Sequence, residues 1–157
     1  MVKRAVSATE KADDGREPTL LYLVGRIDRV VRRAMGTVLE AQGLSVNQYA
    51  TLSVLDRRSG LSNAQLARRA LVSPQSVNEV LRALEQRGLV RRRAHPDHGR
   101  ILLTRLTAKG RALLARCDAE VHQVEARMVS GLSEDEQAAL RGGLLSSIRT
   151  LQGGLQG

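Results

Sequence analysis

The sequence has few aromatic residues, a single cysteine and no long apolar run. Phenylalanine and tryptophan are absent and tyrosine occurs twice, so we expect an aliphatic core. The one cysteine, Cys117, cannot form a disulfide within the chain, and its place on an apolar helix face favours a buried, unreactive thiol. No stretch approaches the roughly 18 to 20 apolar residues of a membrane span, and residues 1–16 lack the apolar centre of a signal peptide. We therefore expect a cytoplasmic protein with no membrane partner.

Positive charge dominates the composition, and most of it lies in one segment. The 157 residues include 25 Lys and Arg against 16 Asp and Glu, which gives a formal net charge of +9. Residues 61–111 carry 11 basic and three acidic side chains, so this segment alone accounts for +8. A basic cluster of this kind attracts a polyanion, and we expect double-stranded DNA as the partner.

Hydrophobic periodicity and capping residues predict four helices in the first half of the chain. Helices are expected over about 18–42, 45–58, 62–69 and 74–87. Ser45 and Ser62 each precede a glutamine by three residues, which is the spacing of a capping box. Ser73 is followed by proline, a pair that is typical of a helix start.

The second half of the chain predicts a hairpin followed by two further helices. Residues 89–93 and 100–106 are expected to form short strands around a tight turn. Thr107 caps the fifth helix, and Ser133 with Glu136 opens the sixth. Two short helices followed by a basic hairpin define a winged helix-turn-helix. The predicted fold class is therefore mainly α with a small β-hairpin wing, joined to a helical dimerisation region.

Long helices at the two ends of the chain bracket the compact basic module. We expect a disordered arm over 1–17, a dimerisation region over 18–43 and 107–152, a DNA-binding domain over 44–106 and a frayed tail over 153–157. Helices of about 25 residues span roughly 38 Å, which is more than the small module can cover, so a second copy of the chain is the expected partner. On the fifth helix, apolar residues follow the seven-residue repeat that is typical of paired helices. No other part of the chain is expected to cover this apolar seam. The expected dimer interface is Leu20, Leu114, Cys117, Val121, Val124, Met128, Leu144 and Ile148.

The fourth helix is the expected recognition helix. In a helix-turn-helix the second helix enters the major groove, where polar side chains near its start read base edges. The residues assigned to this role are Gln75, Ser76, Asn78, Glu79 and Arg82, and Ser73, the expected cap of this helix, is also assigned to the DNA-binding surface. Contacts to phosphates are expected from Ser62, Asn63, Arg68 and Arg69 on the third helix and from Arg92 in the basic run of the hairpin.

Three segments resemble the MarR (multiple antibiotic resistance regulator) family over residues 18–152. They are LSVNQYATLSVL (44–55), LSNAQLARRALVSPQSVNEVLRALEQRGLVRR (61–92) and DHGRILLTRLTAKG (97–110). The resemblance implies a homodimer on a pseudo-palindromic operator, with the fourth helix in the major groove and the wing arginine, here Arg100, in the minor groove. His98 stands where the family commonly has aspartate, two residues before that arginine. The resemblance also implies that small, often aromatic anionic ligands or oxidants relieve DNA binding.

The chain offers three residues for such an effector. Tyr22, Arg26 and Tyr49 are expected to line a pocket where the first, second and fifth helices meet the DNA-binding domain. With only two tyrosines, stacking is limited, so we hypothesise a small anionic or lipophilic effector, such as an aliphatic or small aromatic acid held by Arg26. The alternative is that Arg26 is an ordinary solvated helix residue.

Other function classes fit the sequence less well. A non-regulatory or architectural DNA-binding protein would use the same basic module without ligand coupling, and the length of its footprint would distinguish it from a repressor. An enzyme is not expected, because the chain has no Gly-rich phosphate loop and no nucleophile elbow. We expect no metal and no cofactor. His95 and His98 lie in a turn without a nearby cysteine, while Asp118, His122 and Glu125 are interpreted as a solvated helix face.

Overall fold

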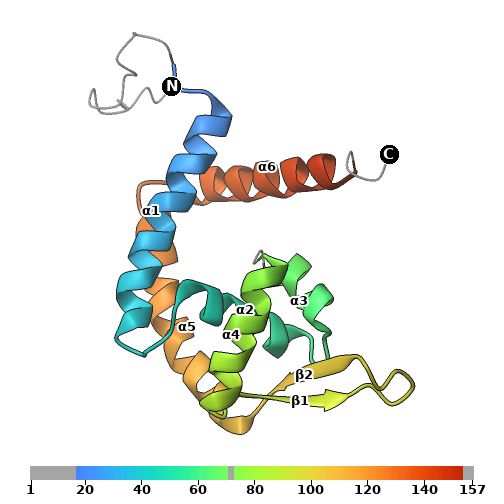
Figure 1. Cartoon of the computed structure of the whole chain (residues 1–157). Coiled ribbons are helices and arrows are strands. Elements are labelled where there is room, and N and C mark those ends of the chain that lie inside the picture. The colour runs from blue at the N-terminus through green and yellow to red at the C-terminus, as the bar shows by residue number, and fades with distance from the viewer. Residues whose placement is uncertain (1–16, 71–72, 154–157) are drawn as a thin grey trace.

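The computed structural model describes residues 17–70 and 73–153, which form six helices and one two-stranded hairpin (Figure 1). The elements are α1 (Leu20–Glu40), α2 (Val46–Arg57), α3 (Asn63–Ala70), α4 (Pro74–Gln86), β1 (Val90–Ala94), β2 (Leu102–Leu106), α5 (Ala108–Val129) and α6 (Glu134–Gly153). The strands pair antiparallel, with Val90 opposite Leu106. The predicted fold class, mainly helical with a small hairpin wing, is confirmed.

Three predicted segments lie wholly or mostly outside residues 17–70 and 73–153. The expected arm before Glu17, the connection at 71–72 and the tail after Gly153 lie outside the described residues. Within the described ranges, none of the helices combines the length and the apolar character that a bilayer crossing requires.

Polar caps and a glycine set helix boundaries where the sequence predicts them. Ser45 Oγ accepts the Gln48 N–H at 3.2 Å, and Gln48 Oε1 accepts the Ser45 N–H at 3.0 Å, which completes the predicted capping box. The same reciprocal pair joins Ser62 to Gln65. After α1 the chain turns at Gly43, whose φ of +67° lies in the left-handed region that favours glycine.

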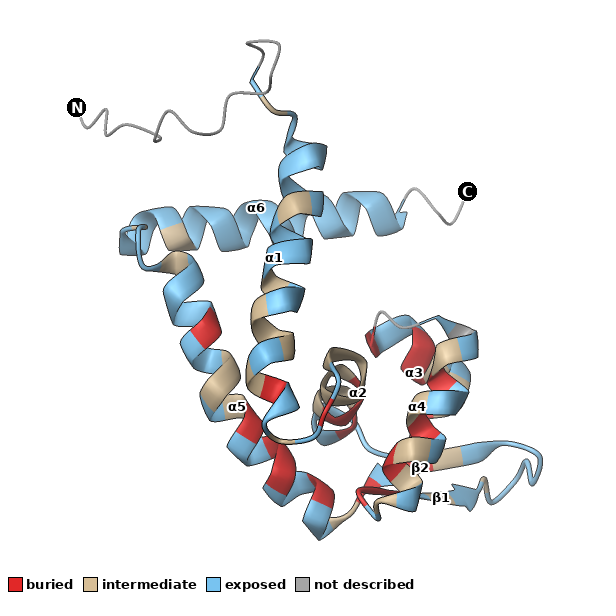
Figure 2. Cartoon of the chain, turned by 60° about the vertical axis from the view of Figure 1, so that its left-hand side comes forward, coloured by how far each residue is buried: buried red, intermediate tan, exposed pale blue. Residues whose placement is uncertain are grey.

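One aliphatic cluster joins α2, α3, α4 and the hairpin, which we call the lobe (residues 44–106), to the first half of α5 (Figure 2). Leu52 of α2, Leu66 of α3 and Leu81 of α4 are fully buried. Leu39 enters the cluster from α1 and Cys117 from α5. The predicted aliphatic core is confirmed, and α5 takes part in it directly.

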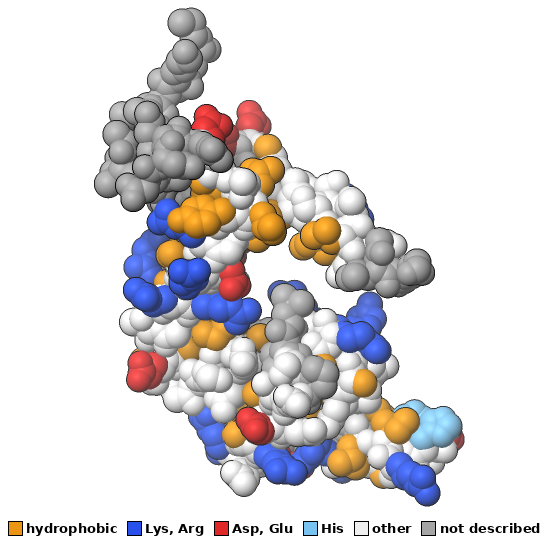
Figure 3. Space-filling view, turned by 45° about the horizontal axis from the view of Figure 1, so that its top comes forward, with side chains coloured by type: hydrophobic (Ala, Val, Ile, Leu, Met, Phe, Trp, Pro, Cys, Tyr) orange, Lys and Arg blue, Asp and Glu red, His pale blue; other side chains and the backbone are white. Residues whose placement is uncertain are grey.

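α6 and the first half of α1 are built differently from the lobe. α6 contains no buried residue, and Figure 2 shows it almost entirely exposed. Leu20, at the start of α1, is 82% exposed. Figure 3 shows hydrophobic side chains gathered over α1 and α6, with a hollow between these helices and the lobe. The largest exposed apolar surface of the described chain therefore lies away from the core.

The dimer seam predicted on α5 needs a correction. We expected its apolar residues to lack cover within the chain, but Leu114, Cys117 and Val124 are buried. α1 and α2 both pack on α5, and Leu114 and Cys117 belong to the same cluster as residues of these two helices. A side chain that is already covered has no surface left to lose to a partner, so these three are core residues. Val121 is half-buried at the edge of the cluster, and Met128 remains exposed near the end of α5.

Candidate DNA-binding surface and neighbouring sites

α4 presents a polar face opposite its buried stripe. Leu81 and Leu84 point into the core and are fully buried. Helical geometry turns the residues on the other side toward solvent, and Gln75, Glu79 and Arg82 are exposed there. The face that the sequence assigns to base contacts is thus open to solvent, at the surface of a rigid support.

Hydrogen bonds within the chain hold the other polar residues assigned to α4. Asn63 Nδ2 of α3 donates to Asn78 Oδ1 at 2.6 Å and so links the two helices of the helix-turn-helix. Ser73 Oγ caps α4 by accepting the Ser76 N–H at 3.2 Å, and it donates to Ser76 Oγ at 2.8 Å. The asparagine pair therefore ties α4 to α3, and the two serines cap the start of α4.

The group of phosphate contacts predicted on α3 divides into two parts. Arg68 and Arg69 are exposed in the last turn of the helix. The Ser62 N–H, in contrast, donates to Gln65 Oε1 at 2.9 Å and serves the start of the helix itself. The two arginines are therefore the side chains of α3 that offer positive charge to an anion.

In the hairpin, Arg92 forms an ion pair within the chain, whereas the turn between the two strands is exposed. The sequence assigns Arg92 to the DNA backbone, but its Nε donates to Glu85 Oε2 at 2.9 Å, and this ion pair ties β1 to α4. The bond to Arg92 holds the pKa of the Glu85 carboxyl below its usual range. His98 and Arg100 are exposed in the turn between β1 and β2, where the rings of His95 and His98 lie 5.1 Å apart. In Figure 1 this turn is the part of the hairpin farthest from the helices.

The three candidate effector residues fall into two groups by their contacts. On the first half of α1, the guanidinium carbon of Arg26 lies 5.9 Å from the centroid of the Tyr22 ring. Tyr49 of α2 donates its hydroxyl to Asp118 Oδ1 of α5 at 2.8 Å. Burial and this hydrogen bond raise the pKa of Tyr49 to about 12. The Tyr49 phenol is thus already satisfied within the chain, beside a carboxylate that disfavours a second anion.

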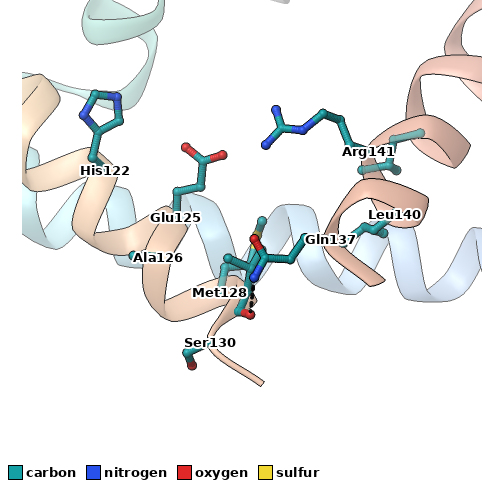
Figure 4. Close-up of a pocket in the computed structure, with 10 residues that line it drawn as sticks. His122, Glu125, Ala126, Met128, Ser130, Gln137, Leu140 and Arg141 are labelled. Atoms are coloured by element: carbon teal, nitrogen blue, oxygen red, sulfur yellow. Dashed lines mark hydrogen bonds between the residues drawn. The ribbon is translucent and has the colours of Figure 1, made fainter. Parts of the chain in front are cut away.

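A groove of about 540 Å³ lies between the end of α5 and α6 (Figure 4). His122 and Glu125 project into it from α5, and Arg141 reaches toward them from α6. Helical spacing in the sequence places Asp118 on the same face as His122 and Glu125. In the structure, however, Asp118 accepts a hydrogen bond from Tyr49 of α2. Nowhere in residues 17–70 and 73–153 do three or more His, Cys, Asp or Glu side chains gather closely enough to hold a metal ion.

A set of contacts at the end of α4 was not predicted from the sequence. Arg87 Nη1 donates to the carbonyl of Gly43 at 2.6 Å, and Lys109 Nζ donates to the carbonyl of Arg87 at 2.8 Å. From the sequence, both cations were recognised only as members of the basic segment 61–111. Neither contact has a local sequence signal, because the partners lie 44 and 22 residues apart.

Comparison with known proteins identifies the family. A family model described as MarR family matches residues 42–101, which run from the turn after α1 to the turn of the hairpin. The HTH-type transcriptional repressor Rv2887 of Mycobacterium tuberculosis is 41% identical over 126 residues, which cover 80% of this chain and 88% of the relative. The chain belongs to the MarR family. The family resemblance in the sequence is therefore confirmed, and the protein is a transcriptional regulator.

Two solved structures of this MarR-family relative are similar to the chain over most of its length. Rv2887 in complex with salicylic acid gives a TM-score of 0.69 at 38% identity, covering 83% of this chain and 96% of that one. Rv2887 in complex with DNA gives a TM-score of 0.68 at 36% identity, covering 83% of this chain and 98% of that one. The winged helix-turn-helix of this chain therefore has the architecture of a MarR regulator.

Proposed function

We propose that the protein is a dimeric repressor that binds a pseudo-palindromic operator in double-stranded DNA and is released by a small-molecule effector. One observation carries the proposal: the solvent-exposed polar face of α4 lies between two basic elements, α3 and the hairpin. The similarity to Rv2887, a repressor with a solved DNA complex, supports it.

In this proposal helix and wing have different tasks. Gln75, Glu79 and Arg82 of α4 read bases in the major groove, which distinguishes all four base pairs. Arg100, with His98 beside it in the turn, enters the minor groove, where attraction grows as the groove narrows. Arg68 and Arg69 bind phosphates and fix the register. The DNA-binding domain is then 44–106, and the first half of α5 packs against its core.

The dimerisation region in this proposal uses the second half of α5 together with α1 and α6. Leu20, Met128, Leu144 and Ile148 keep between 42% and 82% of their surface exposed in one chain. Their exposure, and the absence of a buried residue from α6, support an interface with a second copy. The groove between α5 and α6 would be covered in that dimer.

For the effector we propose a small aromatic acid held at Tyr22 and Arg26. An aromatic ring with a cation above it suits a planar anion, and Rv2887 has been solved with salicylic acid. Tyr49 would act indirectly, through its bond to Asp118 between α2 and α5. Salicylic acid should release DNA from the wild-type protein, and Arg26→Ala should weaken this response. An unchanged response in Arg26→Ala would remove the assignment.

Selection of bound sites from random DNA tests the function. We expect two inverted half-sites whose centres lie about 10 to 10.5 base pairs apart. On that operator Arg82→Ala should cost about 1 to 3 kcal/mol and relax preference at one position per half-site. Arg100→Ala should weaken many sequences together, and Arg116→Ala, which removes an exposed cation of α5, is the control. Binding without sequence preference and without a defined footprint would favour an architectural protein instead.

A further inference from the structure

The short segment between α4 and β1 is clamped from two sides. On one side the Arg87 guanidinium donates to the carbonyl of Gly43, which follows α1. On the other side Lys109, in the first turn of α5, donates to the Arg87 carbonyl. We name Gly43, Arg87 and Lys109 the helix-end joint. Through it the end of α4 contacts the turn that follows α1 and the first turn of α5, and Figure 1 shows this end of α4 beside the start of α5.

Thr107 and Gly110 make further close contacts at the same junction. Thr107 Oγ1 donates to the Gly88 carbonyl at 2.7 Å, and the Thr107 N–H donates to the Leu89 carbonyl at 3.1 Å. Gly110 lets α5 approach so closely that an added Cβ would lie 2.1 Å from the Leu89 oxygen. The segment 87–89 therefore has little room to move relative to α5.

The two cations of the joint, Arg87 and Lys109, also lie near the C-terminal ends of two helices. The C-terminal end of a helix carries partial negative charge, which a nearby cation stabilises. Neither α1 nor α4 has a basic residue in its own last turn. Arg87 supplies that charge to the end of α1, and Lys109 supplies it to the end of α4. These charge-assisted hydrogen bonds are stronger than neutral ones, so the joint fixes helix directions as well as positions.

We propose that Arg87 and Lys109 are positioning residues that set the angle of the recognition helix to the dimerisation helices and so determine which half-site spacing the dimer accepts. The inference rests on the proposed function. Gln75 lies 12 residues from Arg87, about 18 Å along the axis of α4. A tilt of about 10° at the joint moves the Gln75 end by about 3 Å, close to the 3.4 Å rise of one base pair. A loosened joint therefore lets a dimer fit spacings that the native joint rejects.

The experiment compares DNA duplexes that differ only in spacing. An operator selected from random DNA by the wild-type full chain is remade with one base pair added or removed at its centre, alongside a duplex with a single half-site. Each added base pair rotates one half-site by about 35° relative to the other. For wild type we expect the operator to bind about tenfold tighter than either altered duplex.

The variants separate the joint from general effects of charge and folding. Arg87→Ala and Lys109→Ala should reduce this ratio to about threefold or less while half-site affinity changes less than about twofold. Arg87→Lys, which can still reach a carbonyl with one donor, should retain most of the ratio. Arg116→Ala removes an exposed cation of α5 outside the joint and should leave the ratio unchanged. Melting curves show whether each variant is folded, and if Arg87→Ala is not, Lys109→Ala decides.

The remaining outcomes are distinguishable. If the folded Arg87→Ala and Lys109→Ala proteins keep the wild-type ratio, or Arg116→Ala lowers it equally, the inference is wrong while the proposed function stands. The same holds if half-site and full-operator binding weaken in parallel, or if Arg87→Lys behaves like Arg87→Ala. If the wild-type protein selects no paired half-sites, the proposed function itself fails, and the inference with it.

Discussion

The lobe and α6 both carry rows of aliphatic side chains, but only the lobe covers them. Leu52, Leu66 and Leu81 lose all their accessible surface within one chain. Leu144 and Ile148, spaced four residues apart on α6, keep 46% and 49% of theirs. The lobe therefore buries its aliphatic side chains within a single chain, whereas α6 leaves an apolar face exposed, which the proposed dimer would cover.

The largest expected contrast comes from truncating one leucine in each region. Leu52→Ala leaves a cavity in the core and should lower the free energy of unfolding by about 2 to 5 kcal/mol at every protein concentration. Leu144→Ala should act through association, so its cost shrinks as the protein is diluted. Urea unfolding at two protein concentrations measures both. A cost of Leu144→Ala that does not depend on concentration would contradict the division into two regions.

Glycine substitutions should change stability in opposite directions on α6 and at the point where α5 packs against the lobe. At Gly110 of α5 an added methyl meets the Leu89 carbonyl, so Gly110→Ala should destabilise by about 1 to 3 kcal/mol. At Gly142 of α6 nothing lies within 4 Å, so Gly142→Ala should stabilise the helix by about 0.5 to 1 kcal/mol. Thermal and urea unfolding report both changes. Equal effects at the two sites would mean that α5 does not pack closely on residue 89.

The two tyrosines provide a smaller and pH-dependent contrast. Tyr49→Phe removes the hydroxyl bond to Asp118 and should cost about 0.5 to 1.5 kcal/mol, whereas the exposed Tyr22→Phe should cost nothing measurable. The pKa of Tyr49 is raised from 10.0 to about 12, so its stabilising contribution is complete below pH 10 and is lost as the pH rises toward 12. Stability measured from pH 8 to 12 should therefore fall less in Tyr49→Phe. Identical pH profiles for the two proteins would rule out this contribution.

The smallest effect is expected at the single thiol. Cys117 is fully buried, and burial raises the pKa of its thiol above the usual value, with the Asp118 charge adding to the increase. A thiol-reactive disulfide reagent should label it only as fast as the chain unfolds, and peroxide should not change DNA binding. Rapid labelling of the folded protein would show that α1 and α2 do not cover α5 as described.

The helix boundaries were predictable from sequence because their chemistry is local. Ser45 and Ser62 each bond to a glutamine three residues away, so the sequence contains both partners of each cap. The cover over Leu114 and Cys117 was not predictable in this way. A seven-residue spacing defines one face of a helix, but it does not specify which element packs on that face.

The candidate DNA-binding surface shows the same limit. The exposed face of α4 follows from helical periodicity alone. Arg92 and its neighbours look equivalent in a run of three arginines, although strand alternation from the buried Val90 places Arg92 on the inner side, toward Glu85. Arg87 and Gly43 meet only through the tertiary fold, so no local pattern predicts their contact.

We propose that a second copy of the chain covers the apolar face of α6 and the first half of α1. Sedimentation equilibrium at micromolar concentration tests it directly. We predict a mass of about 34 kDa for the wild type, twice the 17.1 kDa of one chain, and about 17 kDa for a folded variant that combines Leu144→Glu with Ile148→Glu. A wild-type mass of one chain, or a double variant that remains a dimer, would contradict the account.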